Sequence, residues 1–273
     1  MIKNIMSIDL EDYFCDLSYL KWNEFESRID DNTNKILELL EKYNATATFF
    51  TVGHIAENHP ELIEKIINHG HEIASHSHYH RDLRKLDAKM FEEDLRKSIS
   101  VLEKISGEKV NGFRAPYYSI NKNNFWVFDI LRKYVKYDSS IFPVKTPLYG
   151  LPCAPRFTYQ MSNTNPLKEQ KDGKLLEIPP ITMKIPIYGN LPIAGGFYLR
   201  VLPVYFIKTG IKKFNKQHAS AMCYIHPHDI DPLRPRIQGV RSRAYWGIKN
   251  SMRKFETLLK EFNFCSVREK YLE

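Results

Sequence analysis

The stretch Ser75-His76-Ser77-His78-Tyr79-His80 decides how this sequence is interpreted, because it places three histidines at alternate positions. His76 and His80 are four residues apart, a spacing that puts two side chains on one face of a helix. Two neutral imidazoles joined by a carboxylate from elsewhere form a common ligand set for a catalytic divalent metal ion. Histidine-rich stretches also occur on surfaces and in cores. The rest of the sequence must therefore supply the missing partners.

The composition is typical of a soluble globular protein. The chain has 273 residues, of which 43% are hydrophobic and 26% charged, and this length is enough for one large α/β domain or two small ones. The net charge of +8 favours an anionic partner, or reflects a solvated basic surface. A nucleic-acid partner is disfavoured because the sequence has no recognition helix and no basic-aromatic run.

Cysteine usage and hydropathy predict a cytoplasmic protein. Cys15, Cys153, Cys223 and Cys265 lie far apart without a C-x-x-C pair, so we expect reduced thiols. The N-terminal segment is too short and too soon charged for a signal peptide. No apolar run approaches the roughly 18 residues that span a bilayer. We therefore expect no transmembrane segment, and leave peripheral membrane contact open.

Strand and helix patterns alternate along the chain. Strands are predicted at residues 2–8, 45–53, 71–75, 110–113, 135–137, 175–178, 219–225 and 264–267. Helices are predicted to begin near Asn32, Pro60, Asp87, Asn121, Pro203 and Arg243, the last running to Phe262. This alternation predicts a single parallel α/β domain over residues 1–273, and a barrel fits better than an open sheet. Residues 141–172 and 189–200 carry no period and are predicted to be long loops.

Chemically active side chains follow the predicted strands. They are Asp9, Glu11 and Asp12, then His76 and His80, and then Arg114, Asp138 and His226. In α/β barrels the carboxyl ends of the strands carry the active site. Five strand ends with metal-ligand and acid–base residues are hard to obtain by chance, so we expect these residues to form a site.

In order and spacing, these segments resemble the five motifs of the polysaccharide deacetylases, also called NodB-homology or carbohydrate esterase family four proteins. The family motifs T-F-D-D, H-[S/T]-x-x-H, R-x-P-Y, D-x-S and L-x-H are similar to residues 7–12, 76–80, 114–117, 138–140 and 224–226. The resemblance covers nearly the whole chain. The D-x-E-D-Y-F start and the H-P-x-D end are most similar to a branch found with bacterial surface-polysaccharide biosynthesis, whose members work inside the cell.

The resemblance implies a distorted (β/α) barrel, usually of seven strands, and a metal ion held by one aspartate and two histidines. Carried over by position, His76 and His80 are metal ligands, Asp12 is the carboxylate ligand and Asp9 is the general base. The family has adjacent aspartates where two residues separate Asp9 from Asp12 here, so Glu11 is an alternative ligand. We expect one divalent ion, Zn²⁺, with Co²⁺, Ni²⁺ and Fe²⁺ as alternatives.

The remaining motif residues receive proton-transfer roles. His226 is predicted to protonate the leaving amine, with His228 as the alternative acid. Asp138 is predicted to pair with the His226 imidazole and to favour its protonated, positively charged form. Arg114 is predicted to pair with Asp9 and keep that carboxylate ionised.

Substrate contacts are predicted at Pro116 and Tyr117 and in the two long loops. The family places a backbone N–H that stabilises the oxyanion at the position of Tyr117. Cations and aromatic rings of the loops and of the segment after His226 predict an anionic glycan or sugar precursor. These residues are Lys145, Tyr149, Arg156, Tyr159, Lys168, Lys171, Phe197, Tyr198, Arg200, Arg234, Arg236, Arg241 and Arg243.

The expected function is metal-dependent removal of an N-acetyl group from an acetamido sugar. The sugar would lie in a surface glycan or in its nucleotide- or lipid-linked precursor. One alternative is hydrolysis of another small amide, such as a formamido sugar or a purine-type amide. Another is a catalytically dead barrel that binds glycans.

Overall fold

The computed structural model describes residues 2–193, 195–238, 240 and 242–273. By internal contacts the chain divides into two compact units. Unit 1 consists of Met1–Phe49, Glu64–Glu72 and Ile193–Glu273, and unit 2 consists of Phe50–Ile63 and Ile73–Pro192. The elements β2 (Thr48–Thr51), α3 (Pro60–Asn68) and β3 (Glu72–Ser75) cross the boundaries in sequence. A single domain over residues 1–273 stays a prediction.

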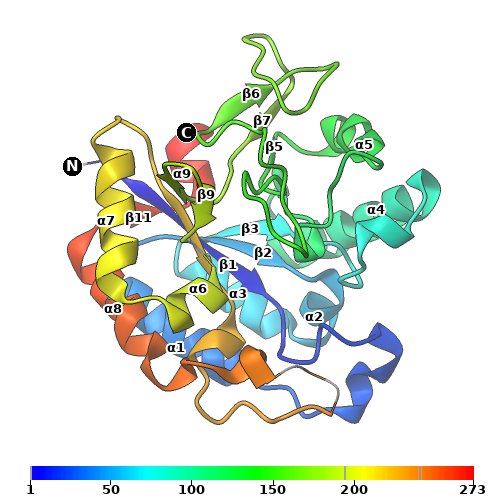
Figure 1. Cartoon of the computed structure of the whole chain (residues 1–273). Helices are drawn as coiled ribbons and strands as arrows, with labels where there is room; N and C mark the ends of the chain where they lie inside the picture. The colour runs from blue at the N-terminus through cyan, green and yellow to red at the C-terminus, as the bar shows by residue number, and fades with distance from the viewer. Residues whose placement is uncertain (1, 194, 239, 241) are drawn as a thin grey trace. The chain divides into compact units, whose positions relative to one another are not determined.

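Unit 1 is built on the fully buried strand β1, Asn4–Leu10. Strand β10 (Met222–Ile225) runs parallel to it, with Ile8 opposite Ile225, and β11 (Phe264–Cys265) is parallel to its first residues. The helices of unit 1 are α1 (Ile29–Lys42), α6 (Gly196–Val201), α7 (Val204–Asn215), α8 (Ser251–Glu261) and α9 (Val267–Tyr271). Helices α7 and α8 pack side by side (Figure 1). An all-buried parallel strand of this kind needs cover on both faces.

Unit 2 contains a parallel run of β3, β4 (Gly112–Phe113), β5 (Tyr137–Asp138) and β7 (Leu175–Glu177). Strand β6 (Tyr159–Met161) is antiparallel to β7. The helices are α2 (Gly53–Asn58), α4 (Ala88–Ser106) and α5 (Trp126–Tyr134), and α4 and α5 contribute Phe91, Leu95, Phe128 and Leu131 to the core. The mixed α/β class predicted from the sequence is confirmed.

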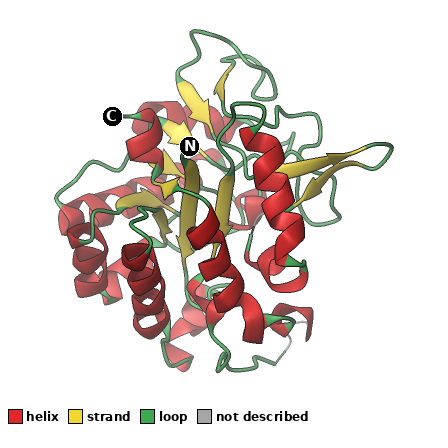
Figure 2. Cartoon of the chain, turned by 90° about the vertical axis from the view of Figure 1, so that its left-hand side faces the viewer, coloured by secondary structure: helices red, strands yellow, loops and turns green. Residues whose placement is uncertain are grey.

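Each of the eight predicted strands has a counterpart, but the loop predictions were incomplete. Strand β6 lies inside residues 141–172, and β9 (Gly189–Pro192) and the start of α6 lie inside residues 189–200. Strand β9 pairs with β8 (Thr182–Ile185) in an antiparallel ribbon, seen at the right of Figure 2. Strand β9 has the sequence Gly-Asn-Leu-Pro, whose glycine, asparagine and proline are typical of a turn and not of a strand, which explains why it was missed.

The predicted helix from Arg243 to Phe262 was wrong in its first half. The chain forms two short 3-10 turns, Ser242–Tyr245 and Ile248–Asn250, and α8 begins only at Ser251. Gly247 separates the turns with φ of 74°. A Cβ at Gly247 would lie 2.3 Å from the carbonyl oxygen of Arg200, so this position requires glycine.

None of the helices in the described residues combines the length and the apolar character that a membrane span requires. The cysteines Cys15, Cys153, Cys223 and Cys265 are all free, as the sequence predicted.

Helix α4 anchors the histidine stretch from within unit 2. Its Asp94 carboxylate accepts the backbone N–H of His78 at 2.6 Å, and the hydroxyls of Ser98 and Ser75 lie 2.8 Å apart. The helix is capped by Asp87, which accepts the N–H of Met90 at 2.8 Å.

We expect Asp87→Ala to lower the free energy of unfolding by about 1 kcal/mol, because the N-cap hydrogen bond is lost. Asp87→Asn is the matched control and should leave stability nearly unchanged, since asparagine caps equally well. Urea unfolding measures both values. An equal loss in both variants would show that the cap does not stabilise α4.

Candidate active site

The strand ends of unit 1 bring acids and imidazoles together. Because Ile8 lies opposite Ile225, the next residues along the two parallel strands, Asp9 and His226, become neighbours. The Nε2 atom of His226 lies 3.7 Å from Oδ2 of Asp9 and 3.5 Å from Oε1 of Glu11. Asp9 and Glu11 are both buried. Buried carboxylates need a charged or hydrogen-bonding partner, and His226 is one.

His226 is held from its other side by Asp229. The Nδ1 atom of His226 lies 2.6 Å from Oδ2 of Asp229, which sits three residues further on in a 3-10 turn, Pro227–Ile230. Burial alone would lower the pKa of His226, but the carboxylates of Asp229, Glu11 and Asp9 outweigh burial and raise it to about 9. His226 therefore carries a positive charge at neutral pH.

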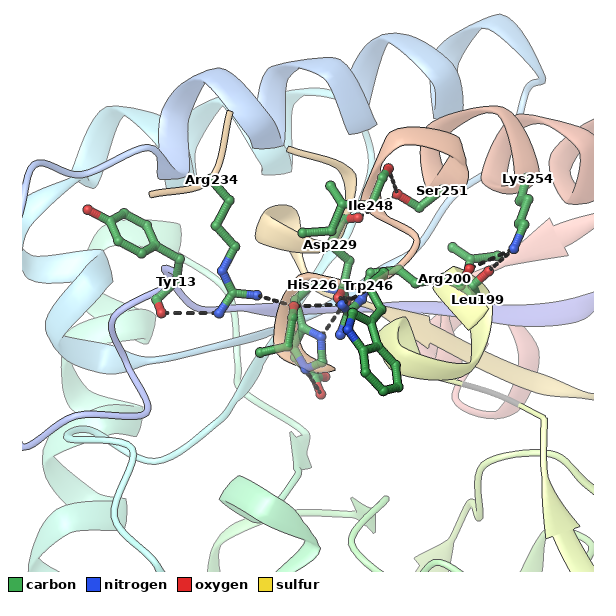
Figure 3. A network of polar contacts seen from close by, with 12 residues as sticks. Tyr13, Leu199, Arg200, His226, Asp229, Arg234, Trp246, Ile248, Ser251 and Lys254 are labelled. Carbon is green, nitrogen blue, oxygen red and sulfur yellow. Dashed lines mark hydrogen bonds and ion pairs between the residues drawn. The ribbon is translucent and has the colours of Figure 1, made fainter. Parts of the chain in front are cut away.

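Arg200 completes the chain of charges behind His226 (Figure 3). Its Nε atom lies 2.9 Å from Oδ1 of Asp229. Burial would raise the pKa of Asp229, but His226 and Arg200 keep it well below its usual range. A Cβ at Gly196, in the first turn of α6, would lie 1.4 Å from Oδ2 of Asp229, so only glycine allows this close approach.

Helix α8 supports this chain through two side chains. The Ser251 hydroxyl contacts the carbonyl oxygen of Asp229 at 2.5 Å. The Lys254 ammonium donates to the carbonyl oxygens of Leu199 and Arg200 at 2.9 and 2.8 Å, at the end of α6. A cation at a helix C-terminus is favourable. Contacts from Ser251 and Lys254 of α8 thus hold the main chain at Asp229 and Arg200 in place.

His228 differs from His226 in charge although the two rings stack, with centroids 4.9 Å apart and planes 5° from parallel. Burial and the nearby Arg234 lower the pKa of His228 well below its ordinary value, so its imidazole is neutral. Ligand atoms of Glu11, His226 and His228 lie within 4.8 Å of one another, but a protonated His226 has no lone pair to offer a metal ion.

Asp12 links the end of β1 to Tyr13, Ser27 and Arg28. Its carboxylate accepts the N–H of Tyr13 at 2.8 Å, the hydroxyl of Ser27 at 2.7 Å and the N–H of Arg28 at 2.9 Å. The role of Asp12 as a metal ligand, with Glu11 as the alternative, stays a prediction.

The histidine stretch is a loop in unit 2, and the helix that the His76–His80 spacing suggested is absent there. Ser77 and His80 have φ of 63° and 49°, which no α-helix contains. The loop nevertheless brings the rings of His76 and His80 to a centroid distance of 5.1 Å. Nδ1 of His76 lies 2.7 Å from the carbonyl oxygen of Arg114. A carbonyl only accepts, so Nδ1 carries the hydrogen and Nε2 keeps a lone pair for a metal ion.

Arg114 is fully buried at the end of β4. Its guanidinium donates to the carbonyl oxygen and the hydroxyl of Ser139 at 3.2 and 2.8 Å, and lies 4.0 Å from the ring centroid of Phe50. These contacts fix the main chain whose carbonyl orients His76. The predicted pairing of Arg114 with Asp9 stays a prediction.

Asp138 has partners that the sequence did not reveal. It accepts the hydroxyl of Ser140 at 2.6 Å and shares a hydrogen bond with Glu177 of β7. Burial and the adjacent Asp138 charge raise the pKa of Glu177 well above its usual range, so Glu177 holds the shared proton. The carboxylate in direct contact with the Nδ1 of His226 is that of Asp229, and the predicted pairing of Asp138 with His226 stays a prediction.

Pro116 and Tyr117 form a 3-10 turn, Pro116–Tyr118, in which Tyr117 has φ of 59°. A non-glycine residue in this region stores strain, which is typical of functional turns. The ring of Tyr117 lies 4.7 Å from that of His80. The oxyanion role of the Tyr117 N–H and the substrate contact of Pro116 stay predictions.

Three of the arginines assigned to substrate binding have structural partners. Arg200 pairs with Asp229, Arg156 donates to the backbone and hydroxyl of Thr182, and Arg234 donates to the carbonyl oxygens of Tyr13 and Ala244. Arg200 is buried and paired with Asp229, and its contact with the substrate stays a prediction. Arg241 lies outside the described residues.

Comparison with known proteins identifies two family regions. The polysaccharide deacetylase family matches residues 18–131, and a domain of unknown function, DUF3473, matches residues 139–272. The first region includes His76, His80 and Arg114. Asp9 and Asp12 precede it, and His226 lies in the second region.

Curated relatives agree with the first region. A peptidoglycan deacetylase of Helicobacter pylori is 28% identical over 201 residues, which are 73% of this chain and 62% of that protein. A peptidoglycan-N-acetylglucosamine deacetylase of Bacillus cereus is 34% identical over 91 residues, 33% of each protein. The chain thus spans less than two thirds of the length of these relatives.

Solved structures share the fold. A protein of Mycobacterium smegmatis described as a polysaccharide deacetylase is 18% identical, with a TM-score of 0.64 over 96% of this chain and 85% of that one. A CE4 family pseudoenzyme of Bacillus anthracis is 14% identical, with a TM-score of 0.51 over 98% of this chain and 65% of that one. Residues 18–131 thus form a polysaccharide deacetylase domain of the NodB-homology, or carbohydrate esterase family four, type, and the chain shares its fold with a solved structure described as a polysaccharide deacetylase.

Proposed function

We propose that this protein hydrolyses the N-acetyl group of an acetamido sugar, releasing acetate and a free amine. The observation that carries the proposal is the charged His226, held by Asp229 beside the Asp9 and Glu11 carboxylates. Such an arrangement sets a proton donor next to proton acceptors, which is what amide hydrolysis needs. The match of residues 18–131 to the polysaccharide deacetylase family supports deacetylation as the reaction.

We propose further that a divalent metal ion, Zn²⁺, takes part. His76 and His80 fit as ligands because their rings are adjacent and the Nδ1–H of His76 is bound to a carbonyl oxygen. Asp12, or Glu11 in its place, is the carboxylate that the sequence predicts. When bound, such an ion would polarise the acetyl carbonyl and lower the pKa of a bound water to about 7.

The protein's own residues would move two protons. Asp9 takes one proton from the attacking water as the new carbon–oxygen bond forms. His226 gives its proton to the sugar nitrogen as the carbon–nitrogen bond breaks, and Asp229 stabilises the imidazolium beforehand. The backbone N–H of Tyr117 would receive the oxyanion. We assign the acid role to His226 and not to His228. The His226 imidazolium can give up a proton near neutral pH, whereas the N–H of the neutral His228 ring is too weak an acid to do so.

The substrate is a bacterial acetamido glycan. The names of the relatives favour peptidoglycan, whereas the sequence branch favours a surface-glycan precursor. Lys145, Lys168 and Lys171 remain as cations for an anionic sugar nucleotide, lipid-linked glycan or acidic polysaccharide. We propose a cytoplasmic location on the support of the four free thiols.

Two other functions compete with deacetylation. Hydrolysis of a formamido sugar or purine-type amide would use the same proton transfers. A glycan-binding barrel without activity is favoured by one observation, the fold similarity to a CE4 family pseudoenzyme. Product analysis separates all three.

We expect the metal-loaded protein to release acetate from N-acetylglucosamine oligomers and from a diphosphate-linked acetamido sugar. His76→Ala and His80→Ala should each remove the catalytic ion and lower the rate by about a hundredfold or more. His69→Ala, which removes an exposed imidazole, is the control. Metal analysis and an acetate assay across a salt series give the readouts, and a KM that rises with salt for the diphosphate substrate supports the anionic proposal.

Formate release would instead establish the formamido alternative. Glycan binding without any product from the metal-loaded protein would establish the dead barrel and contradict deacetylation.

The alkaline limb of kcat/KM should report the loss of the His226 proton near pH 9. In Asp229→Asn the limb should move to lower pH by about one to two units, because the carboxylate that favours the imidazolium is gone. Asp231→Asn is the control, since this carboxylate pairs with Arg28. An alkaline limb that stays in place in Asp229→Asn would mean that His226 is not the acid.

A further inference from the structure

Unit 2 contains a second cluster of metal-ligand side chains that the proposed reaction does not use. His54 and Glu57 lie three residues apart on α2, and His78 lies in the loop after β3. Ligand atoms of these three residues lie within 4.8 Å of one another. His78 has no part in the proposed reaction, in which His76 and His80 are the metal ligands.

The backbone fixes the two segments against each other. The N–H of His54 donates to the carbonyl oxygen of His78 at 3.0 Å, and the N–H of Gly53 donates to that of Ser77 at 2.9 Å. Asp94 holds the N–H of His78 at 2.6 Å. The cluster is therefore preorganised before any ligand binds, which favours binding.

His78 is the strongest sign that a ligand belongs here. Its side chain is 0% exposed, and neither ring nitrogen makes a hydrogen bond to any described residue. Buried polar atoms without hydrogen bonds are rare and costly. The Nε2 atom instead faces Oε2 of Glu57 at 3.3 Å without hydrogen-bond alignment.

The distances match the edges of a small coordination tetrahedron. Ligand bonds of 2.0–2.1 Å to a tetrahedral Zn²⁺ place neighbouring donor atoms about 3.3 Å apart. Oε2 of Glu57 lies 3.3 Å from Nε2 of His78 and 3.7 Å from Nδ1 of His54. A common oxygen thus faces both imidazoles at nearly the required spacing.

The other carboxylate oxygen of Glu57 has a partner that would orient it. Nζ of Lys97 lies 3.7 Å from Oε1 of Glu57 and 2.9 Å from the hydroxyl oxygen of Tyr79. Ligating carboxylates are commonly held by such outer contacts. The side chains of His54 and Glu57 are 26% and 36% exposed, so an ion can enter from solvent.

We propose that His54, Glu57 and His78 bind one divalent ion of the Zn²⁺ class, with water in the fourth position. The ion ties α2 to the loop that carries His76 and His80. It would therefore stabilise the histidine loop without touching the substrate. The proposal does not depend on the deacetylase activity.

The test counts bound Co²⁺ and Zn²⁺ in metal-stripped full-length protein, by calorimetry and by elemental analysis after desalting. Glu57→Gln and His54→Ala should each bind one ion fewer than the wild type. Glu61→Gln and His69→Ala remove one exposed carboxylate and one exposed imidazole outside the cluster, and should bind as many ions as the wild type. Circular dichroism of the metal-free variants checks that they fold, and the partly exposed Glu57 makes Glu57→Gln the safer variant.

An unchanged number of ions in folded Glu57→Gln and His54→Ala would overturn the proposal. His76→Ala separates this result from the proposed catalytic metal. Loss of one ion in Glu57→Gln and of a different one in His76→Ala supports both sites. Loss of an ion in His76→Ala alone would support the catalytic metal site and contradict the site at His54, Glu57 and His78.

Discussion

The candidate site depends on one constraint, which is that buried charges must be paired. The buried Arg200 and Asp229 and the partly buried His226 form a chain of alternating charge that ends beside Asp9 and Glu11. Removing any member would leave a buried charge without compensation. The raised pKa of His226 also links the chain to stability. Its contribution is complete below about pH 6.5, the ordinary histidine value, and is lost as pH rises through about 9.

The rest of each unit serves to place these groups. In unit 1 the parallel pairing of β1 and β10 sets Asp9 beside His226, and α8 holds Asp229 and the end of α6. In unit 2 the pairing of β3, β4 and β5 sets His76 beside the main chain of Arg114, and Asp94 of α4 holds the histidine loop. The reactive side chains thus lie at the ends of paired strands, and the pairing of the strands determines which of them become neighbours.

Much of this was predictable from the sequence, because buried parallel strands leave a strong hydrophobic signal. All eight predicted strands exist, and the reactive residues stand at strand ends as expected. The partners of those residues were not predictable in the same way. Asp229 follows His226 by three residues and signals a capping turn, but Glu177 and Arg200 become partners only through folding. Nor does a His-x-x-x-His spacing reveal that Ser77 and His80 adopt positive φ.

The proposed proton transfer requires His226 to be an imidazolium at neutral pH, and the carboxylates of Asp229, Glu11 and Asp9 hold it in that state. Nitrogen NMR of histidine-labelled protein measures this directly, with the His226 signals assigned by loss in His226→Gln. We predict that both ring nitrogens of His226 are protonated at pH 7.5 and titrate together near pH 9. A neutral His226 ring at pH 7.5, titrating at or below the ordinary value of about 6.5, would contradict the account.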